Sequence, residues 1–431
     1  MADQADTLDP NTLRRNAAPS LVLGGRVLSL PPTFAALRHY NYRLFFAGQL
    51  TSLVGTWMQN VAQAWLVYDL TQSPFYLGFV SFASSIPVLT LSPLAGVVID
   101  RVPKRSILLC TQTIAMLLAF LLSADVFLRQ VQPWHIIVLS FCLGIVNTFD
   151  GPTRQSFVVE MVERQDLSNA IALNSAIFNT ARIIGPTLAG IALAAVGPAW
   201  CFFLNGVSFL AVIAGLYLMR VRPMVAARKK ASALAQLAEG ISYIRHHRTV
   251  LTLMSIVAVA NLFAFGYSSL LPAFAQDVLG VGPAGLGFMS AAVGVGALSG
   301  ALLIASLGNF QRKGALLTAG NLIFPAMVLL LSLSRRLELS LVILAGAGFG
   351  FLTQNATTNT LIQSTVPDEL RGRVMSVYLM IFQGFFPLGS LLAGTIAQSY
   401  GVPAGAAFGA CVALAYGMLL LWRAPYVRRL A

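Results

Sequence analysis

The sequence is poor in charged residues. Asp, Glu, Lys and Arg together make up 10% of its 431 residues, whereas about 25% is usual for a soluble globular domain. Hydrophobic residues make up 57%, against a usual content of about 45–50%. This composition argues against a soluble domain and predicts a protein that crosses a membrane several times.

Cysteine and histidine are also scarce, and each occurs four times. No spacing among them fits a metal site or a disulfide framework, and the sequence has no P-loop of the kind that binds nucleotides. We therefore expect no metal, no cofactor and no ATP hydrolysis. The cysteines are expected to be small packing residues in or beside apolar segments, at Cys110, Cys142, Cys201 and Cys411.

Long apolar runs, in contrast, are abundant. About 20 helical residues cross a hydrocarbon core ~30 Å thick, and the backbone must be helical there because lipid offers it no hydrogen-bond partners. The sequence has twelve such runs, which predict an all-α membrane fold with twelve transmembrane helices. They cover residues 44–68, 75–99, 106–128, 134–158, 168–196, 200–219, 250–272, 284–308, 315–333, 339–362, 373–399 and 403–422.

The positive charge is distributed unevenly around these runs. The net charge is +13, and the chain has 28 Lys and Arg. If both termini are cytoplasmic, nearly all of these residues fall in cytoplasmic loops, tails or helix ends, as the orientation rule for membrane proteins requires. We therefore predict cytoplasmic termini and no nucleic-acid partner. The exceptions are Arg129, Arg182, Arg335 and Arg336.

A polar segment and an internal repeat divide the runs into two groups of six. Segment 220–248 starts with basic residues and then has apolar residues near helical spacing, which predicts an amphipathic linker helix. Moving residues 143–197 along by 204 positions aligns Gly185 with Gly389. Two related six-helix bundles with a substrate site between them are typical of secondary transporters. The predicted parts are a cytoplasmic tail (1–43), a bundle (44–220), a cytoplasmic linker (221–248), a second bundle (249–423) and a cytoplasmic tail (424–431).

The loop after the second run has a characteristic pattern. Its residues Gly96-Val-Val-Ile-Asp100-Arg101-Val-Pro-Lys104-Arg105 resemble the signature of the major facilitator superfamily. Segments 41–74, 149–158 and 366–378 are similar to the bacterial subfamily that contains the enterobactin exporter and related transmembrane secretion effectors. The resemblance runs from about residue 38 to 422 and implies a multi-pass transporter of the bacterial inner (cytoplasmic) membrane.

The resemblance also implies a cytoplasmic gate. In the superfamily the signature Asp interacts with the start of the eleventh helix, where free N–H groups and the helix dipole favour an anion. A role limited to orienting the loop is an alternative for Lys104 and Arg105. The expected gate consists of Gly96, Asp100, Arg101, Lys104, Arg105, Arg371 and Arg373.

The fifth run contains the stretch ARIIGPTLAG, residues 181–190. Its spacing resembles a pattern of drug antiporters, although Ala replaces some of the family's glycines. The resemblance implies a helix that bends at its proline and packs through small residues on the eighth helix, sealing the outer side of the cavity. Ordinary packing with no role in transport direction is the alternative. The positions are Ala181, Gly185, Pro186, Ala189 and Gly190.

Two charged residues are expected deep in the membrane. Arg182 lies ~21 Å from the inner end of its run at 1.5 Å per residue, and an Arg near the bilayer centre costs about 2.5–3.5 kcal/mol on insertion scales. It must therefore face protein or water, and its expected partner is Asp150, which shares a helix face with Arg154. Burial favours a protonated Asp150 and a nearby Arg favours the carboxylate, so Asp150 could carry a proton. A static Asp150–Arg154 pair, or a substrate contact, is the alternative.

The first run has a polar face, because Gln49, Thr56, Asn60 and Gln63 recur at helical spacing. Lipid would not solvate this face, so we expect it to line a central cavity. Aromatic walls with scattered amides suit a bulky amphipathic ligand, although each residue could instead pack between helices. The predicted cavity residues are Gln49, Thr56, Trp57, Asn60, Gln63, Asn261, Phe265, Gln354, Phe382, Gln383 and Phe386.

Together these features predict a secondary active transporter that exports a small amphipathic molecule, either a drug-like compound or a siderophore. Proton antiport is the expected drive, since one charge moved across about 100 mV is worth about 2.3 kcal/mol. The expected partners are this small molecule, protons and the lipid bilayer, and we expect a monomer that is not an enzyme. An importer or symporter on the same fold is the first alternative, and a membrane sensor or enzyme is the second.

Overall fold

The structure, a computed structural model, describes residues 20–23, 26–29, 31–220, 233–307 and 311–430. The first half of the chain contributes α2 (Tyr40–Thr71), α3 (Pro74–Ile99), α4 (Lys104–Phe127), α5 (Pro133–Met161), α6 (Leu167–Val196) and α7 (Pro198–Leu218). The second half contributes α8 (Ala233–His246), α9 (Arg248–Val259), α10 (Leu271–Ala273), α11 (Gly282–Leu307), α12 (Lys313–Leu333), α13 (Leu337–Thr365), α14 (Asp368–Tyr400) and α15 (Val402–Arg423).

Eleven helical segments in the described part of the chain are long and apolar enough to cross a membrane. They match eleven of the twelve predicted runs. The remaining run corresponds to α2, which has 32 residues but is outside this group. Its polar residues Gln49, Gln59, Asn60 and Gln63 explain the difference, because they lower its apolar content without shortening the helix. The all-helical membrane fold is therefore confirmed for eleven spans.

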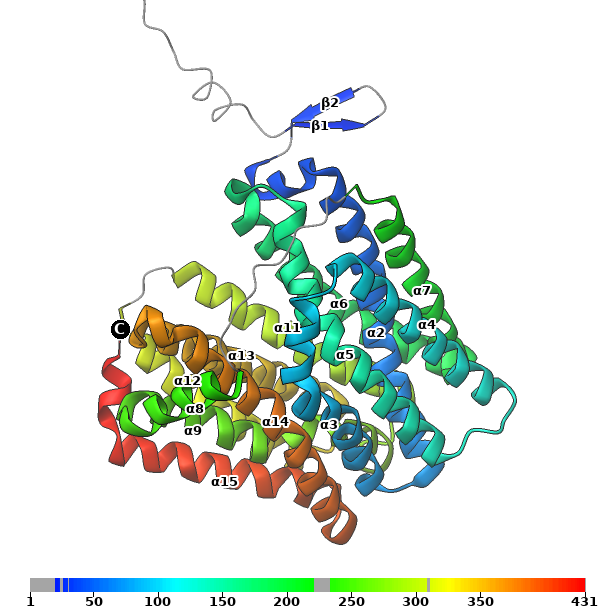
Figure 1. Cartoon of the computed structure of the whole chain (residues 1–431). Coiled ribbons are helices and arrows are strands. Elements are labelled where there is room, and N and C mark those ends of the chain that lie inside the picture. The colour runs from blue at the N-terminus through cyan, green and yellow to red at the C-terminus, as the bar shows by residue number, and fades with distance from the viewer. Residues whose placement is uncertain (1–19, 24–25, 30, 221–232, 308–310, 431) are drawn as a thin grey trace, which may run out of the picture.

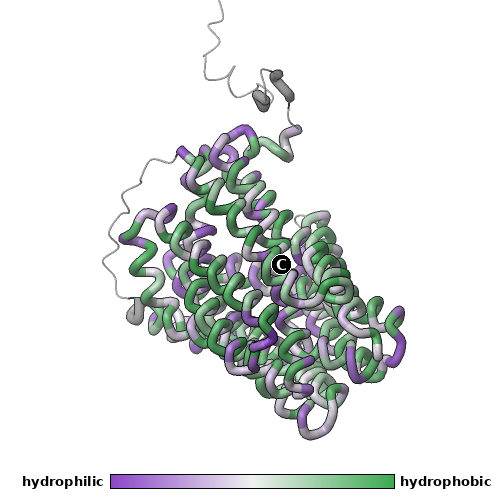
Figure 2. The backbone as a smooth tube through the Cα atoms, turned by 90° about the vertical axis from the view of Figure 1, so that its right-hand side faces the viewer, coloured by the Kyte–Doolittle hydropathy of each residue, from purple (hydrophilic) through white to green (hydrophobic). Residues whose placement is uncertain are grey.

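The helices form two groups, which Figure 1 shows on opposite sides of the molecule. Within the first, α2 packs on α6 and α7, while α3 and α4 pack on α5. Within the second, α13 packs on α11 and α12, while α15 packs on α12 and α14. Two helix pairs, α3 with α14 and α6 with α11, join the groups. Figure 2 shows apolar residues along the length of the helices and many polar ones at their ends.

The same turn occurs at equivalent places in both halves. Gly197 separates α6 from α7 at φ 85°, and Gly401 separates α14 from α15 at φ 90°. An L side chain is strained at such angles, so glycine suits both turns. Proline follows at Pro198 and Pro403, within the first two positions of α7 and α15. A proline there costs little because helix-start N–H groups have no partner in the helix.

The predicted run 250–272 is not a regular helix. After α9, the chain continues as η3 (Ala260–Ala264), a π-helix, then η4 (Phe265–Leu270), a 3-10 helix, then α10, and then the π-helix η5 (Phe274–Val278). Pro272 cannot donate a backbone hydrogen bond to the preceding turn. Ser268 and Ser269 donate their hydroxyl groups to the carbonyls of Phe265 and Gly266, at 2.9 and 2.8 Å. This irregular stretch places Phe265 and both serines beside the first bundle.

The chain before α2 differs from the predicted tail. Residues 1–19 lie outside the described part; β1 (Ser20–Leu23) and β2 (Arg26–Ser29) form an antiparallel hairpin, and η1 (Pro32–Arg38) follows. Asp166, at the end of η2 (Arg164–Asp166), contacts His39 at 2.6 Å and Arg38 at 2.8 Å. The last short element is η6 (Pro425–Arg429). Ion pairs therefore fasten the segment before α2 to the first bundle.

Candidate functional site

A cavity of about 540 Å³ lies between the two bundles. Its walls come from α2, α3, α5 and α6 of the first bundle and from η4, α10, α11 and α14 of the second. Its size suits a drug-sized molecule, since ligand sites are about 300–1,000 Å³. Its polar and aromatic residues are Trp57, Asn60, Gln63, Ser81, Ser84, Ser85, Ser140, Asn147, Arg182, Phe265, Ser268, Ser269, Ser290 and Phe386.

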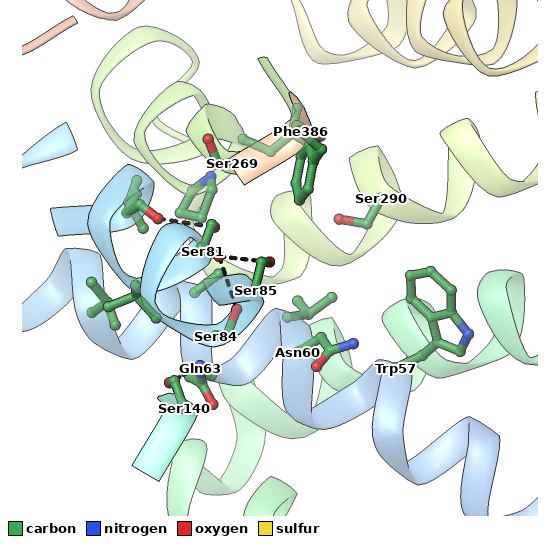
Figure 3. A pocket seen from close by; sticks show the side chains of 18 of the residues that line it. Trp57, Asn60, Gln63, Ser81, Ser84, Ser85, Ser140, Ser269, Ser290 and Phe386 are labelled. Carbon is green, nitrogen blue, oxygen red and sulfur yellow. Dashed lines mark hydrogen bonds between the residues drawn. The ribbon is translucent and has the colours of Figure 1, made fainter. Parts of the chain in front are cut away.

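Serines form much of the polar surface. Figure 3 shows Ser81, Ser84 and Ser85 on one stretch of α3, with Ser290 and Phe386 across the cavity. Ser84 and Ser85 each donate a hydrogen bond of 2.9 Å to the Ser81 carbonyl. Sequence reasoning missed these serines, although their three- and four-residue spacing placed them on one face. Such a face is the same signal that identified α2.

Phenylalanines form the wall on the second bundle. Phe265 stacks on Phe351 with ring centroids 4.1 Å apart. It also makes an edge-on contact with Phe386, with ring centroids 5.1 Å apart. Phe351 also stacks on Phe382, at 6.3 Å. A recess of about 210 Å³ adjoins the main cavity, and Phe265 and Phe386 line both spaces. Asn261, Phe382 and Gln383 line the recess only.

Three predicted cavity residues lie elsewhere. Gln49 is buried and accepts a hydrogen bond from Arg154 at 2.9 Å. Gln354 is fully buried within the second bundle, where its amide meets the Ile256 carbonyl at 3.4 Å. Thr56 is not a lining residue. Helical spacing identifies which residues share a face, but it does not reveal which part of that face reaches the cavity. The other eight, Trp57, Asn60, Gln63, Asn261, Phe265, Phe382, Gln383 and Phe386, line the cavity or its recess.

Arg182 lines the cavity from α6 but does not pair with Asp150. Its guanidinium lies 5.9 Å from the centre of the Trp57 ring, a cation–π distance. Among the residues that the structure describes, it makes no ion pair and no hydrogen bond. The deep cation is therefore left facing the cavity.

Asp150 instead belongs to a network inside the first bundle. Its side chain is buried, and one carboxylate oxygen accepts hydrogen bonds from Gln112 at 2.7 Å and Thr111 at 3.0 Å. The other oxygen meets Arg154 at 2.9 Å, one helical turn away. Arg154 in turn reaches Gln49 of α2. The network therefore connects α4, α5 and α2 rather than α5 and α6.

Small residues join the bundles at one end. A Cβ added to Gly287 of α11 would lie 2.6 Å from the Pro186 carbonyl oxygen and 2.7 Å from the Gly190 Cα. Gly185 instead faces α2, where a Cβ would lie 2.5 Å from the Trp57 Cβ. The stretch around Pro186 therefore contacts two helices through different residues. Ala181 and Ala189 are both fully buried.

Two hydrogen bonds cross between the bundles at this end. Tyr68, near the end of α2, donates to Asp277 in η5. Ser73, before α3, donates to Gln398 near the end of α14 at 2.6 Å. On α14 itself, a Cβ added to Gly394 would lie 2.6 Å from the Pro74 carbonyl oxygen. Polar and backbone contacts therefore link the bundles at this end.

The opposite end has no comparable link in the described part of the chain. Asp100 is exposed and forms no ion pair there, and Arg101 is exposed beside it. A Cβ added to Gly96 would meet nothing within 4 Å. The remaining gate residues bond within their own bundle: Lys104 to Glu160 at 2.6 Å, Arg105 to the Tyr217 carbonyl at 3.0 Å, Arg371 to Asp368 and Arg373 to Glu239.

Comparison with known proteins agrees with this architecture. The model of the family described as "Transmembrane secretion effector" matches residues 31–429, nearly the whole chain. The chain belongs to this family. As a transmembrane secretion effector of the major facilitator superfamily, it is a multi-pass secondary transporter of the bacterial inner membrane and not an enzyme. The assignment made from its sequence motifs is confirmed.

Relatives of this secretion effector carry different cargo names. It is 24% identical to the staphyloferrin A transporter of Staphylococcus aureus over 84% of this chain and 90% of that protein. It is 28% identical to the multidrug efflux pump Tap of Mycolicibacterium fortuitum over 88% and 93% of the two chains. Among solved structures, a POT family transporter in complex with 5-aminolevulinic acid is similar in fold, with a TM-score of 0.72 and 10% identity. The match covers 95% of this chain and 99% of that transporter.

Proposed function

We propose that this transmembrane secretion effector exports small amphipathic molecules by alternating access, as a monomer with twelve spans and both termini in the cytoplasm. The observation that carries the proposal is a cavity between two bundles that are linked at one end and, among the described residues, have no comparable link at the other. In a transporter of two bundles, rocking of one bundle against the other exposes a shared central site to each side in turn. One chain supplies both bundles, so a single copy suffices.

The proposed orientation makes the closed end the outer one. The links Tyr68–Asp277 and Ser73–Gln398 lie where α2 ends and α3 begins, at the opposite end of α2 from the segment that precedes it. The basic residues Arg101, Lys104 and Arg105 lie at the other end of α3 and the start of α4, where positive charge favours the cytoplasm. The structure then corresponds to a state in which the cavity opens to the cytoplasm, ready to take up cargo.

Outward transport is favoured by the relatives. Tap is named as a multidrug efflux pump, and a macrolide efflux protein of Streptococcus pyogenes is 23% identical over 85% of this chain. The staphyloferrin A transporter, another relative, is named for a siderophore, so we include siderophores among the proposed cargoes. An importer on the same fold is the second candidate, because a single state of an alternating-access transporter is compatible with either direction.

Transport direction can be tested in cells. A strain that lacks its major efflux pumps should accumulate less of a fluorescent amphipathic dye when it expresses the wild-type protein. De-energising the cells should abolish the difference, because outward transport against a gradient needs a drive. A matched strain expressing an equal amount of protein that is cross-linked in one state provides the control. Higher accumulation in the expressing strain would favour the importer.

We also propose proton antiport, with Asp150 as the carrier. Its carboxylate is buried near the middle of α5 and is held by one cation and two neutral donors. The cation, Arg154, is partly exposed and also donates a hydrogen bond to Gln49 of α2. If Asp150 loses its contact with Arg154, protonation of the Asp150 carboxylate is favoured. When the contact forms again, release of that proton is favoured. A static ion pair is the alternative.

The latch of Asp100 is proposed for the other, cytoplasm-closed state. In that state Asp100 would meet the start of α14, where free N–H groups, Arg371 and Arg373 favour an anion. Asp100→Ala should therefore lower turnover by about two- to fivefold, as expected for a helix-terminus charge worth up to about 1 kcal/mol. Initial rates of dye efflux at equal protein level measure the effect. Glu338→Ala, at the exposed outer start of α13, is the control, and equal loss in both variants would contradict the latch.

A further inference from the structure

We propose that the cavity selects molecules that carry a carboxylate or a similar oxyanion next to a planar aromatic part. The inference rests on the proposed function only in taking the cavity as the cargo site. It adds the sign of the cargo's charge, which neither the family nor its relatives' names supply. Three observations support it: the charge of the cavity, its free hydrogen-bond donors and its aromatic wall.

The first observation is the charge of the lining. Arg182 is the one charged side chain among the described residues that line the cavity, and no carboxylate accompanies it. The deep carboxylate, Asp150, is committed to Arg154, Gln112 and Thr111 inside the first bundle. A cation in a low-dielectric site without a counter-ion attracts anions, because an ion pair offsets part of its desolvation. The lining of the cavity therefore has a net positive charge.

The position of Arg182 explains why it stays there unpaired. Its backbone carbonyl lies on the α6–α11 contact, where a Cβ added to Gly294 would be 2.9 Å away. Its guanidinium lies 5.9 Å from the centre of the Trp57 ring, and its N–H groups have no hydrogen-bond partner among the residues that the structure describes. A guanidinium presents donors in a fork that matches the two oxygens of a carboxylate. Arg182 is thus placed to accept an oxyanion at the seam between the bundles.

The second observation is a set of unused donors. Asn60 on α2, Asn147 on α5 and Ser290 on α11 line the cavity and hydrogen-bond to no residue that the structure describes. Figure 3 shows Asn60 and Ser290 on opposite walls of the same space. An oxyanion or its hydroxyl neighbours would satisfy such amide and hydroxyl groups. These donors come from both bundles, so an oxygen-rich ligand can hydrogen-bond to both bundles at once.

The third observation concerns the uncharged part of the ligand. Phe265 and Phe386 meet at 5.1 Å on the second bundle, and the adjoining recess of about 210 Å³ adds Phe382. Aromatic rings favour offset or edge-on contact with another planar ring. A ligand with its anionic end at Arg182 and its planar end at this wall would contact both bundles. A cationic dye would use the same wall but would be repelled by Arg182.

Binding to the purified full-length protein tests the inference. Carboxyfluorescein and a cationic rhodamine ester share one ring system and differ in charge, so fluorescence anisotropy can compare them directly. The wild type should bind carboxyfluorescein at least about tenfold more tightly, as expected when one charge-assisted contact is gained and one repulsion avoided. A methyl ester of the anionic dye, which lacks the carboxylate charge, should bind about tenfold more weakly than its parent.

Variants identify the residue responsible. Arg182→Gln should lower the affinity for carboxyfluorescein at least about tenfold and should not weaken the rhodamine, whereas Arg182→Lys should stay within about threefold of the wild type. Arg336→Gln, which removes the same charge from an exposed position before α13, should change neither affinity. If Arg182→Gln does not fold, the comparison of the parent dye with its ester in the wild type still decides the question.

The outcomes separate this inference from export itself. Equal or tighter binding of the rhodamine by the wild type, or an Arg182→Gln affinity within twofold of the wild type, overturns the anion preference. Outward transport of the rhodamine but not of carboxyfluorescein in vesicles would also overturn it, while leaving export intact. Preferential binding of the anion without outward transport would support the inference and contradict the proposed direction.

Discussion

Asp150→Asn is expected to abolish the coupling of export to a proton gradient while leaving the binding of cargo intact. Asparagine keeps the size of the side chain and can still accept from Gln112 and Thr111, which lie 2.7 and 3.0 Å from the carboxylate. It cannot take up and release a proton. If one coupled proton is lost, the accumulation ratio at about 100 mV should fall by about 50-fold, because one charge across that potential is worth about 2.3 kcal/mol.

The measurement uses inverted vesicles with an imposed proton gradient and a fluorescent cargo. The variant should lose gradient-driven uptake yet retain the exchange of labelled for unlabelled cargo without a gradient, since exchange requires only alternating access. Asp69→Asn, at an exposed position near the end of α2, removes the same charge and should leave both activities unchanged. Gradient-driven uptake at wild-type level in Asp150→Asn would show that the Asp150–Arg154 pair is static.

Gly287→Ala is expected to open the outer end of the cavity. The added Cβ would lie 2.6 Å from the Pro186 carbonyl oxygen and 2.7 Å from the Gly190 Cα, so a backbone has to move. Overpacking of this kind costs about 1–3 kcal/mol. If that cost falls on the closed state alone, the ratio of outward-open to closed molecules should rise about 5- to 150-fold. The outward-open fraction should therefore increase even without cargo.

A single cysteine in the cavity reports this change. Ser84→Cys on α3, in a variant without the four native cysteines, should react faster with a membrane-impermeant maleimide added from outside when Gly287→Ala is also present. Gly151→Ala in α5 is the matched control, because an added Cβ there meets no atom within 4 Å. An unchanged labelling rate in Gly287→Ala would mean that the α6–α11 contact does not seal the outer end.

These two experiments test the two features that proton-driven export requires. An exporter driven by protons needs a titrating group that senses both sides and a barrier that is tight whenever the cavity faces the cytoplasm. Asp150 is buried inside one bundle, whereas Gly287 lies on the contact between bundles. Loss of the first should uncouple transport, and loss of the second should make the membrane leak. The variants should therefore differ in gradient-free exchange and in resting proton leak.

The sequence was informative about the fold because lipid limits the choices open to a chain. Apolar runs of spanning length have to be helical, so the boundaries of α6 and α12 are within two residues of their predicted runs. Segment 250–272 shows the limit of this argument. Hydropathy does not report which residues lack a backbone donor, and the chain changes between π- and 3-10 turns on both sides of Pro272, which lacks one.

The site was less accessible to sequence reasoning. Trp57, Asn60 and Gln63 were found because a polar face on a membrane helix needs an explanation, yet Gln49 on that face binds Arg154 instead of lining the cavity. The serines of α3 were overlooked, since serine is common as a small packing residue in membrane helices. Both errors have one cause. The sequence specifies the face of a helix, while the neighbours of that face depend on how the helices tilt and cross.

Long apolar runs and sequence motifs by themselves determined that this is a multi-pass membrane transporter, and they predicted two similar halves with an arginine too deep to face lipid. Only the tertiary structure decided the partner of that arginine. Separation along the chain is compatible with an Asp150–Arg182 pair, but the packing of α5 on α4 turns Asp150 toward Gln112, while α6 presents Arg182 to the cavity. A side chain's partner is set by the direction in which its helix faces, and that direction results from the packing of every helix around it.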